Sequence, residues 1–137
     1  MPSRLLRSAL FAAAVLALAA ALPMRHLRLV KSSPSADEVM PASPGAIVLW
    51  FSQAPTIRLT RISLADSAGT KLTLDKVKSG TEEFTAMAET TGPLAAGAYT
   101  VSWVTASPDG HVVRGKFGFK VYPAAPAAVS TGAGAPR

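Results

Sequence analysis

The stretch YTVSWV at residues 99–104 decides the fold class, because its aromatic and β-branched residues alternate with small polar ones. In an extended strand, the apolar side chains at every second position would share one face. The runs IVLWF at 47–51 and IRLTRISL at 57–64 have a similar composition, and the second repeats the alternation. These runs predict strands of a sheet with one buried face and one solvated face.

Turn-forming residues separate the predicted strands, which recur about 8 to 12 residues apart without an amphipathic helix between them. This spacing predicts an all-β fold: a single immunoglobulin-like antiparallel β-sandwich of about seven strands with Greek-key connections, over residues 26–122. Trp50, Trp103, Phe117 and Phe119 fall at strand-period positions, so we expect them in the core. The turn segments are 41–45, 67–69, 79–80, 92–93, 96–97 and 108–110.

The two ends of the chain differ in composition from this domain. Residues 1–21 combine Arg4 and Arg7 with an Ala/Leu run and small residues, which predicts a secretory signal peptide cleaved near Ala21, or as late as residue 25. The apolar run is shorter than the roughly 20 residues of a membrane-spanning helix, which makes an uncleaved anchor the weaker alternative. Residues 123–137 are rich in Pro and Ala and predict a disordered tail.

The charge and the cysteine content exclude several classes of function. The chain carries a net charge of +6, and loss of Arg4 and Arg7 with the leader would leave +4. Basic residues are spread singly with acids between them, which does not indicate a nucleic-acid-binding face. Because the sequence has no cysteine, disulfides, thiolate metal sites and a cysteine nucleophile are all excluded.

Two histidines lie at opposite ends of the predicted domain, His26 at its start and His111 in the segment SPDGH at 107–111. Asp109 lies two residues before His111, and this scarcity of other candidate acids and bases favours metal binding over catalysis. The alternative is that Asp109 only forms the turn, since Asp-Gly is a favoured hairpin pair, and that His26 is simply exposed to solvent.

Two motifs give the chain a resemblance to a known family. The segment HLRLVKSSP at 26–34 resembles the beginning of mature CopC-type copper-resistance proteins, and SPDGH followed by GKFGFKV at 115–121 resembles their closing strands. The resemblance implies a CopC-like β-sandwich over residues 26–122 and a Cu(II) site formed by His26, Asp109, His111 and a free terminal amine. Cu(II) favours such nitrogen and oxygen donors.

The sequence also departs from the family pattern. Residues 23–25 precede His26, and cleavage near Ala21 would leave the amine at Leu22, too far away to chelate the metal together with the imidazole. Many relatives have a second histidine where this chain has Arg28. The methionines outside the initiator, Met24, Met40 and Met87, are well separated, so we predict no methionine-rich Cu(I) site.

The resemblance implies a periplasmic, non-enzymatic protein that binds Cu(II) for copper sequestration, resistance or delivery, with a CopD-type inner-membrane transport protein as a candidate partner. His26 and His111 would be nitrogen donors, and Asp109 either an oxygen ligand or the group that orients His111. Two alternatives stay open. One is a metal-free immunoglobulin-like adhesion or chaperone module, and the other is a copper mono-oxygenase with a histidine brace.

Overall fold

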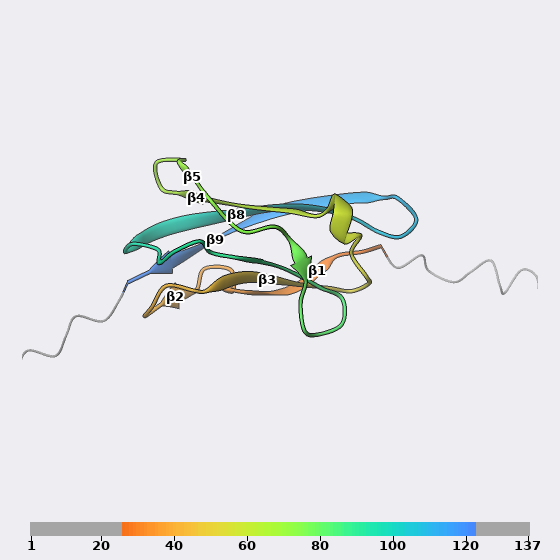
Figure 1. Cartoon of the computed structure of the whole chain (residues 1–137), viewed down its shortest axis with the longest axis horizontal. Coiled ribbons are helices and arrows are strands. Elements are labelled where there is room, and N and C mark those ends of the chain that lie inside the picture. The colour runs from red at the N-terminus through yellow and green to blue at the C-terminus, as the bar shows by residue number, and fades with distance from the viewer. Residues whose placement is uncertain (1–25, 123–137) are drawn as a thin grey trace, which may run out of the picture.

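The computed structural model describes residues 26–122, which form two stacked layers of strands (Figure 1). The predicted signal peptide and the predicted disordered tail lie outside these residues. No helix within 26–122 is long and apolar enough to cross a membrane. The elements in chain order are β1 (Leu29–Ser33), β2 (Val39–Met40), β3 (Ala46–Phe51), the 3₁₀ helix η1 (Ile57–Leu59), β4 (Arg61–Asp66), β5 (Lys71–Leu72), β6 (Lys78–Ser79), β7 (Thr85–Glu89), β8 (Gly97–Ala106) and β9 (Val112–Val121).

The strands form a four-stranded sheet of order β1-β3-β7-β6 and a five-stranded sheet of order β2-β9-β8-β4-β5. The chain crosses between the sheets after β1, β2, β3, β5 and β7, which produces the non-sequential strand order expected of Greek-key connections. The all-β sandwich prediction is therefore confirmed. Residues 26–122 contain nine strands where about seven were expected, because β2, β5 and β6 have only two residues each.

One pairing departs from the antiparallel expectation, since β2 runs parallel to the end of β9. The amide of Asp37 donates to the carbonyl of Gly118 at 2.8 Å, and the amide of Tyr122 donates to the carbonyl of Met40 at 2.9 Å. These bonds fasten a short loop segment onto the edge of the five-stranded sheet. A two-residue strand has no alternation of its own, so sequence periodicity gives no sign of it.

The core lies between the sheets and follows the predicted alternation. Ile47, Leu49 and Phe51 of β3 are buried. Every second residue of β8 from Tyr99 to Trp103 is buried as well. The rings of Phe51 and Trp103 meet edge to face with their centroids 5.4 Å apart, which joins the two layers. Phe119 is also buried and Phe117 is partly buried against the same cluster, as expected.

The prediction for Trp50 is wrong. Because Leu49 and Phe51 turn inward, Trp50 between them turns to the outer face of its sheet. The ammonium of Lys31, on the neighbouring strand β1, lies 4.2 Å from the centroid of the Trp50 ring. This geometry is a cation–π contact at the surface and not a core contact.

The strand predicted over residues 57–64 is also partly wrong, since Ile57–Leu59 is a 3₁₀ helix and the strand begins at Arg61. The break occurs at Thr60, whose side chain turns away from solvent. Its hydroxyl donates to the carbonyl of Thr56 at 3.0 Å and pairs with the buried hydroxyl of Thr105 at 2.8 Å. These local bonds fix a turn that alternation alone cannot distinguish from a strand.

Candidate metal site

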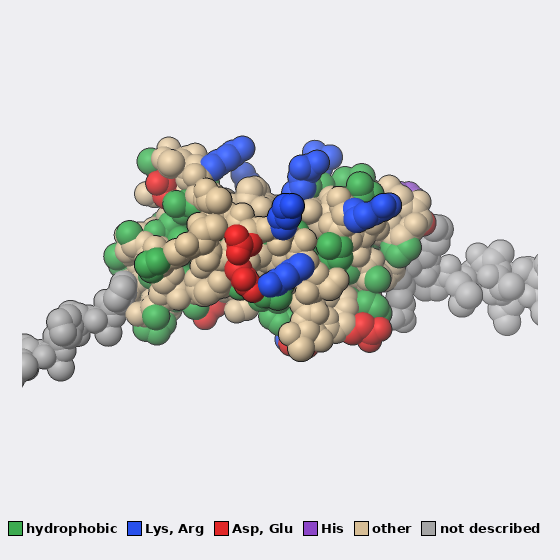
Figure 2. Space-filling view, in the orientation of Figure 1, with side chains coloured by type: hydrophobic (Ala, Val, Ile, Leu, Met, Phe, Trp, Pro, Cys, Tyr) green, Lys and Arg blue, Asp and Glu red, His purple; other side chains and the backbone are tan. Residues whose placement is uncertain are grey.

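The structure brings His26 and His111 together at one end of the sandwich. Their ring centroids are 6.2 Å apart and their planes are inclined by 74°. His26 precedes β1 in the four-stranded sheet, whereas His111 precedes β9 in the five-stranded sheet. A histidine is visible at the right-hand end of the molecule (Figure 2), next to the β8–β9 turn (Figure 1).

The core and Ser52, the residue that follows β3, hold the backbone at His26 in place. The neighbouring Leu27 is 3% exposed and packs into the core, which anchors this part of the backbone. The hydroxyl of Ser52 accepts a hydrogen bond from the amide of Arg28 at 3.1 Å and donates to the carbonyl of His26 at 3.4 Å. The His26 imidazole is therefore exposed on a backbone that the core and β3 hold in place.

The tight turn between β8 and β9 positions His111. The amide of Ser107 donates to the carbonyl of His111 at 2.9 Å, and the amide of Gly110 donates to the carbonyl of Ser107 at 2.9 Å. Gly110 has a φ of +90°, a conformation that residues with a Cβ rarely adopt. Residues 108–110 thus lie in a turn, as their sequence predicts, and the same turn presents Asp109 beside His111.

Asp109 contacts His111 directly. Its Oδ2 lies 2.9 Å from Nδ1 of His111, while the hydroxyl of Ser107 donates to Oδ1. The hydrogen bond from Ser107, followed by that from His111, lowers the pKa of the Asp109 carboxyl from 3.8 to about 2. An ionised carboxylate at this distance favours the tautomer of His111 with its proton on Nδ1, which leaves Nε2 as a free electron-pair donor.

A cavity of about 220 Å³ connects these side chains. It is open to solvent, because the side chains of His111 and Asp109 are 66% and 51% exposed. Gln53 also lines it, a residue that the sequence interpretation missed because nothing in its local sequence points to a site. The other lining residues are His26, Leu27, Ser107, Asp109, His111, Val112 and Val113.

The arrangement is a pair of imidazoles with one attached carboxylate. Within residues 26–122, no three His, Asp or Glu side chains are gathered closely enough to form a ready-made metal group. In this structure Asp109 faces the Nδ1 side of His111, as an orienting residue would. Met40 lies on β2, at the opposite end of β9 from His111, and Met87 lies on β7 of the other sheet.

The chain is similar to known proteins in both sequence and structure. The sequence model of the CopC domain matches residues 29–122. The structure is similar to CopC from Methylosinus trichosporium OB3b, with 32% identity and a TM-score of 0.68 over 74% of this chain and 98% of the other. It is also similar to PcoC, a methionine-rich copper resistance protein from Escherichia coli, with 29% identity and a TM-score of 0.65 over 71% of this chain and 99% of the other.

No curated protein sequence gave a significant match. The domain match covers well over half of the chain, and the similarity to the Methylosinus protein spans almost all of that protein. Both similar structures have the same sandwich, with copper resistance named for PcoC. The chain therefore belongs to the CopC family.

Proposed function

We propose that this protein binds Cu(II) at the end of the sandwich where His26 and His111 meet, and that it carries or sequesters the ion without transforming it. The observation that carries the proposal is the Asp109–His111 contact beside His26. A carboxylate bound to one ring nitrogen of a histidine is a common support for a metal on the other nitrogen. Membership of a family of copper proteins supplies the identity of the metal.

The donor set suits Cu(II) better than Cu(I). Two imidazole nitrogens with carboxylate or water oxygens are the ligands that Cu(II) prefers, whereas Cu(I) favours thioether and thiolate sulfur. Among residues 26–122, none of those that line the cavity between the histidines bears sulfur. His26 and His111 would therefore bind the ion, and Asp109 would orient His111 and add negative charge nearby.

The openness of the site favours a carrier. A Cu(II) ion held between exposed histidines can pass to another protein by ligand exchange without any opening of the fold. We propose that the protein acts in the periplasm after export by residues 1–21, and that a CopD-type membrane protein is the recipient. One of the similar structures, PcoC, is named as a copper resistance protein, in line with a copper-binding function.

Native mass spectrometry of the protein exported by its own leader, with and without one equivalent of Cu(II), tests the proposal. One spectrum reports both the first residue of the mature chain and the number of copper ions bound. We expect one copper in the wild type and none retained in His111→Ala. Asp75→Asn, which removes an exposed carboxylate far from the histidines in sequence, is the matched control and we expect it to retain the ion.

Retention of copper by His111→Ala, or failure of the wild type to bind it, would reject the site. Electron paramagnetic resonance of the copper-loaded protein adds an independent test, because bound imidazole nitrogens split the signal. A spectrum without nitrogen splitting would exclude the histidines as donors.

A further inference from the structure

The first half of β9 is an open sheet edge. Strand β2 covers only the far end of β9, where it pairs with Lys120 and Val121. The amide of Asp37 reaches the carbonyl of Gly118 at 2.8 Å. Before that residue, β9 pairs only with β8 in the part of the chain that the structure describes. Residues 112–117 therefore form a free edge.

The backbone groups of this edge are available for pairing. The amide of Lys120 donates to the carbonyl of Glu38 at 2.8 Å, so Lys120 directs its backbone groups away from β8. In an antiparallel ladder, this direction alternates from residue to residue. The residues that likewise turn their N–H and C=O groups outward at the free edge are Val112, Arg114 and Lys116.

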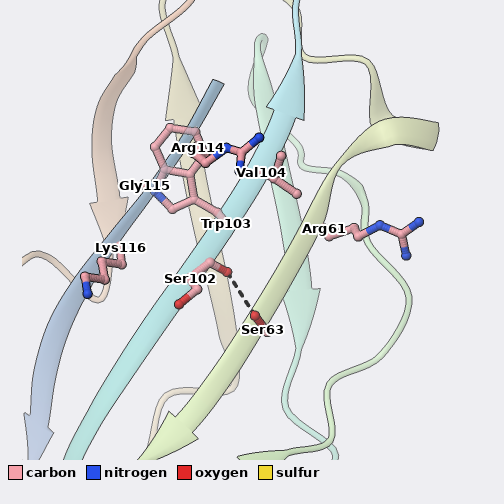
Figure 3. A pocket seen from close by; sticks show the side chains of 8 residues that line it. All are labelled: Arg61, Ser63, Ser102, Trp103, Val104, Arg114, Gly115 and Lys116. Atoms are coloured by element: carbon pink, nitrogen blue, oxygen red, sulfur yellow. Dashed lines mark hydrogen bonds between the residues drawn. The ribbon is translucent and has the colours of Figure 1, made fainter. Parts of the chain in front are cut away.

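The solvent face beside this edge is basic. A cavity of about 510 Å³ lies over β4, β8 and β9, and none of its lining residues is acidic. Figure 3 shows Lys116 extending from the β9 edge, while Arg114 lies over β8. Lys and Arg side chains also project from the side of the molecule that the five-stranded sheet forms (Figure 2). The lining residues are Arg61, Ser63, Ser102, Trp103, Val104, Arg114, Gly115 and Lys116.

The opposite face of the edge combines apolar and polar side chains. A second cavity, of about 400 Å³, lies between β1 and β9. Its large apolar lining residues are Leu29, Val30, Trp103 and Phe117, and its polar ones are Lys31, Ser32, Ser35 and Lys116. The Trp103 ring lies directly against Gly115, where an added Cβ would come within 2.7 Å of it. Trp103, Gly115 and Lys116 line both cavities, whereas the apolar side chains of Leu29, Val30 and Phe117 line only the second one.

We propose that the β9 edge accepts an extended segment of a partner protein in which acidic and apolar residues alternate. Side chains of an added strand point to opposite faces in turn. One set would meet Arg114 and Lys116, where a guanidinium can bind a carboxylate through two hydrogen bonds. The other set would meet Trp103 and Phe117 in the second cavity.

Other occupants fit these observations less well. A second copy pairing β9 with β9 would bring Arg114 and Lys116 of both molecules together, and like charges on paired strands repel. An anionic membrane would use the basic side chains but neither the backbone groups nor the apolar side chains of the second cavity. An added protein strand would use the basic side chains, the free backbone groups and the second cavity together, so these features favour a protein strand.

The first experiment compares two synthetic peptides of identical composition by fluorescence anisotropy, in EDTA to keep the copper site out of the assay. In one peptide glutamate alternates with valine and isoleucine, and in the other the glutamates are grouped at one end. We expect the alternating peptide to bind at least tenfold more tightly, and Lys116→Glu to weaken it at least tenfold. Lys120→Glu is the matched control, because it places the same charge on the same strand where β2 covers the edge, and we expect less than a twofold change.

The second experiment tests the edge itself. Arg114→Pro removes an amide that faces away from β8, so we expect it to abolish binding while the thermal melt shows a folded protein. In the wild type, the amides of Val112, Arg114 and Lys116 should exchange hydrogen more slowly once the peptide is bound. Equal binding of the two peptides, unchanged amide exchange on binding, or tighter binding to phosphatidylglycerol vesicles than to the alternating peptide would overturn the proposal.

Discussion

The smallest unit that explains the site is the Asp109–His111 pair, two residues apart on one turn. The sequence indicated both residues because their motif resembles that of a known family, and because Asp-Gly is typical of a tight turn. The contact between the Asp109 carboxylate and Nδ1 of His111 could not be predicted, since spacing alone does not reveal which ring nitrogen the carboxylate faces. Gln53 could not be predicted, as its place in the cavity depends on two strands meeting in space.

Replacing Asp109 with Asn tests its role as the orienting residue. The amide keeps the shape of the side chain but removes the charge that favours the proton on Nδ1 of His111. We expect the affinity for Cu(II) to fall by about 10- to 100-fold, the usual effect of losing such a partner. A competitive titration against a chelator of known affinity measures it, with Asp75→Asn as the control. An unchanged affinity would show that Asp109 serves only the turn.

The pH dependence of copper binding separates the histidines from Asp109. The pKa of the Asp109 carboxyl is lowered from 3.8 to about 2. The ionised carboxylate therefore contributes to the stability of the folded protein above about pH 4, and this contribution is lost as pH falls through about 2. A metal ion that binds an imidazole nitrogen competes with protons for it, so histidine ligation weakens as pH falls. We expect copper to be released between pH 7 and 5 while circular dichroism shows intact strands. Constant binding from pH 8 to 5 would remove histidine from the site.

At the scale of elements, the strands with clear alternation were predictable and the connections between them were not. The inward set of β8 follows from its sequence because every second residue is apolar. By contrast, Ile57–Leu59 shows the same alternation yet forms a 3₁₀ helix, because the hydroxyl of Thr60 binds a backbone carbonyl and Thr105. Trp50 was assigned to the core as an aromatic residue at a strand-period position, but Leu49 and Phe51 on either side of it face inward, so it lies on the outer face.

The packing of β9 against β8 predicts the effect of changing Gly115. An added methyl group would come within 2.7 Å of the Trp103 ring, which the core holds in place. We expect Gly115→Ala to lower the free energy of unfolding by about 1–3 kcal/mol, the usual cost of overpacking. Gly92→Ala is the matched control, because no atom lies within 4 Å of its added Cβ. Urea denaturation measures the free energy of unfolding of both variants, and equal midpoints would contradict the expected clash.

The core of the opposite sheet offers a second test of packing. Leu49 is completely buried at the centre of β3, and we expect Leu49→Ala to cost about 2–5 kcal/mol of the free energy of unfolding. Val30→Ala, at a position 59% exposed on the adjacent strand, is expected to change it by less than about 0.5 kcal/mol. Similar losses in the two variants would mean that β3 does not carry the core.

At the scale of the whole molecule, we expect the first residue of the exported protein to affect the proposed metal site. A chain that begins at His26 offers an amine next to its imidazole, whereas one that begins at Leu22 does not. We expect the shorter chain to bind Cu(II) at least tenfold more tightly, because a chelate ring adds a donor at little entropic cost. Titration of both chains, each with a verified mass, measures the difference. Equal affinities would show that the amine is not a ligand.

The two histidines belong to different layers of the sandwich and lie about 85 residues apart in the chain. An ion held by both would therefore cross-link the layers and close most of the domain into one loop. Such a cross-link restricts the unfolded chain far more than the folded one, and it opposes separation of the sheets at the end where the N-terminal segment enters. Copper binding would therefore strengthen the mechanical coupling between the two layers. A recipient that removes the ion would also remove this restraint.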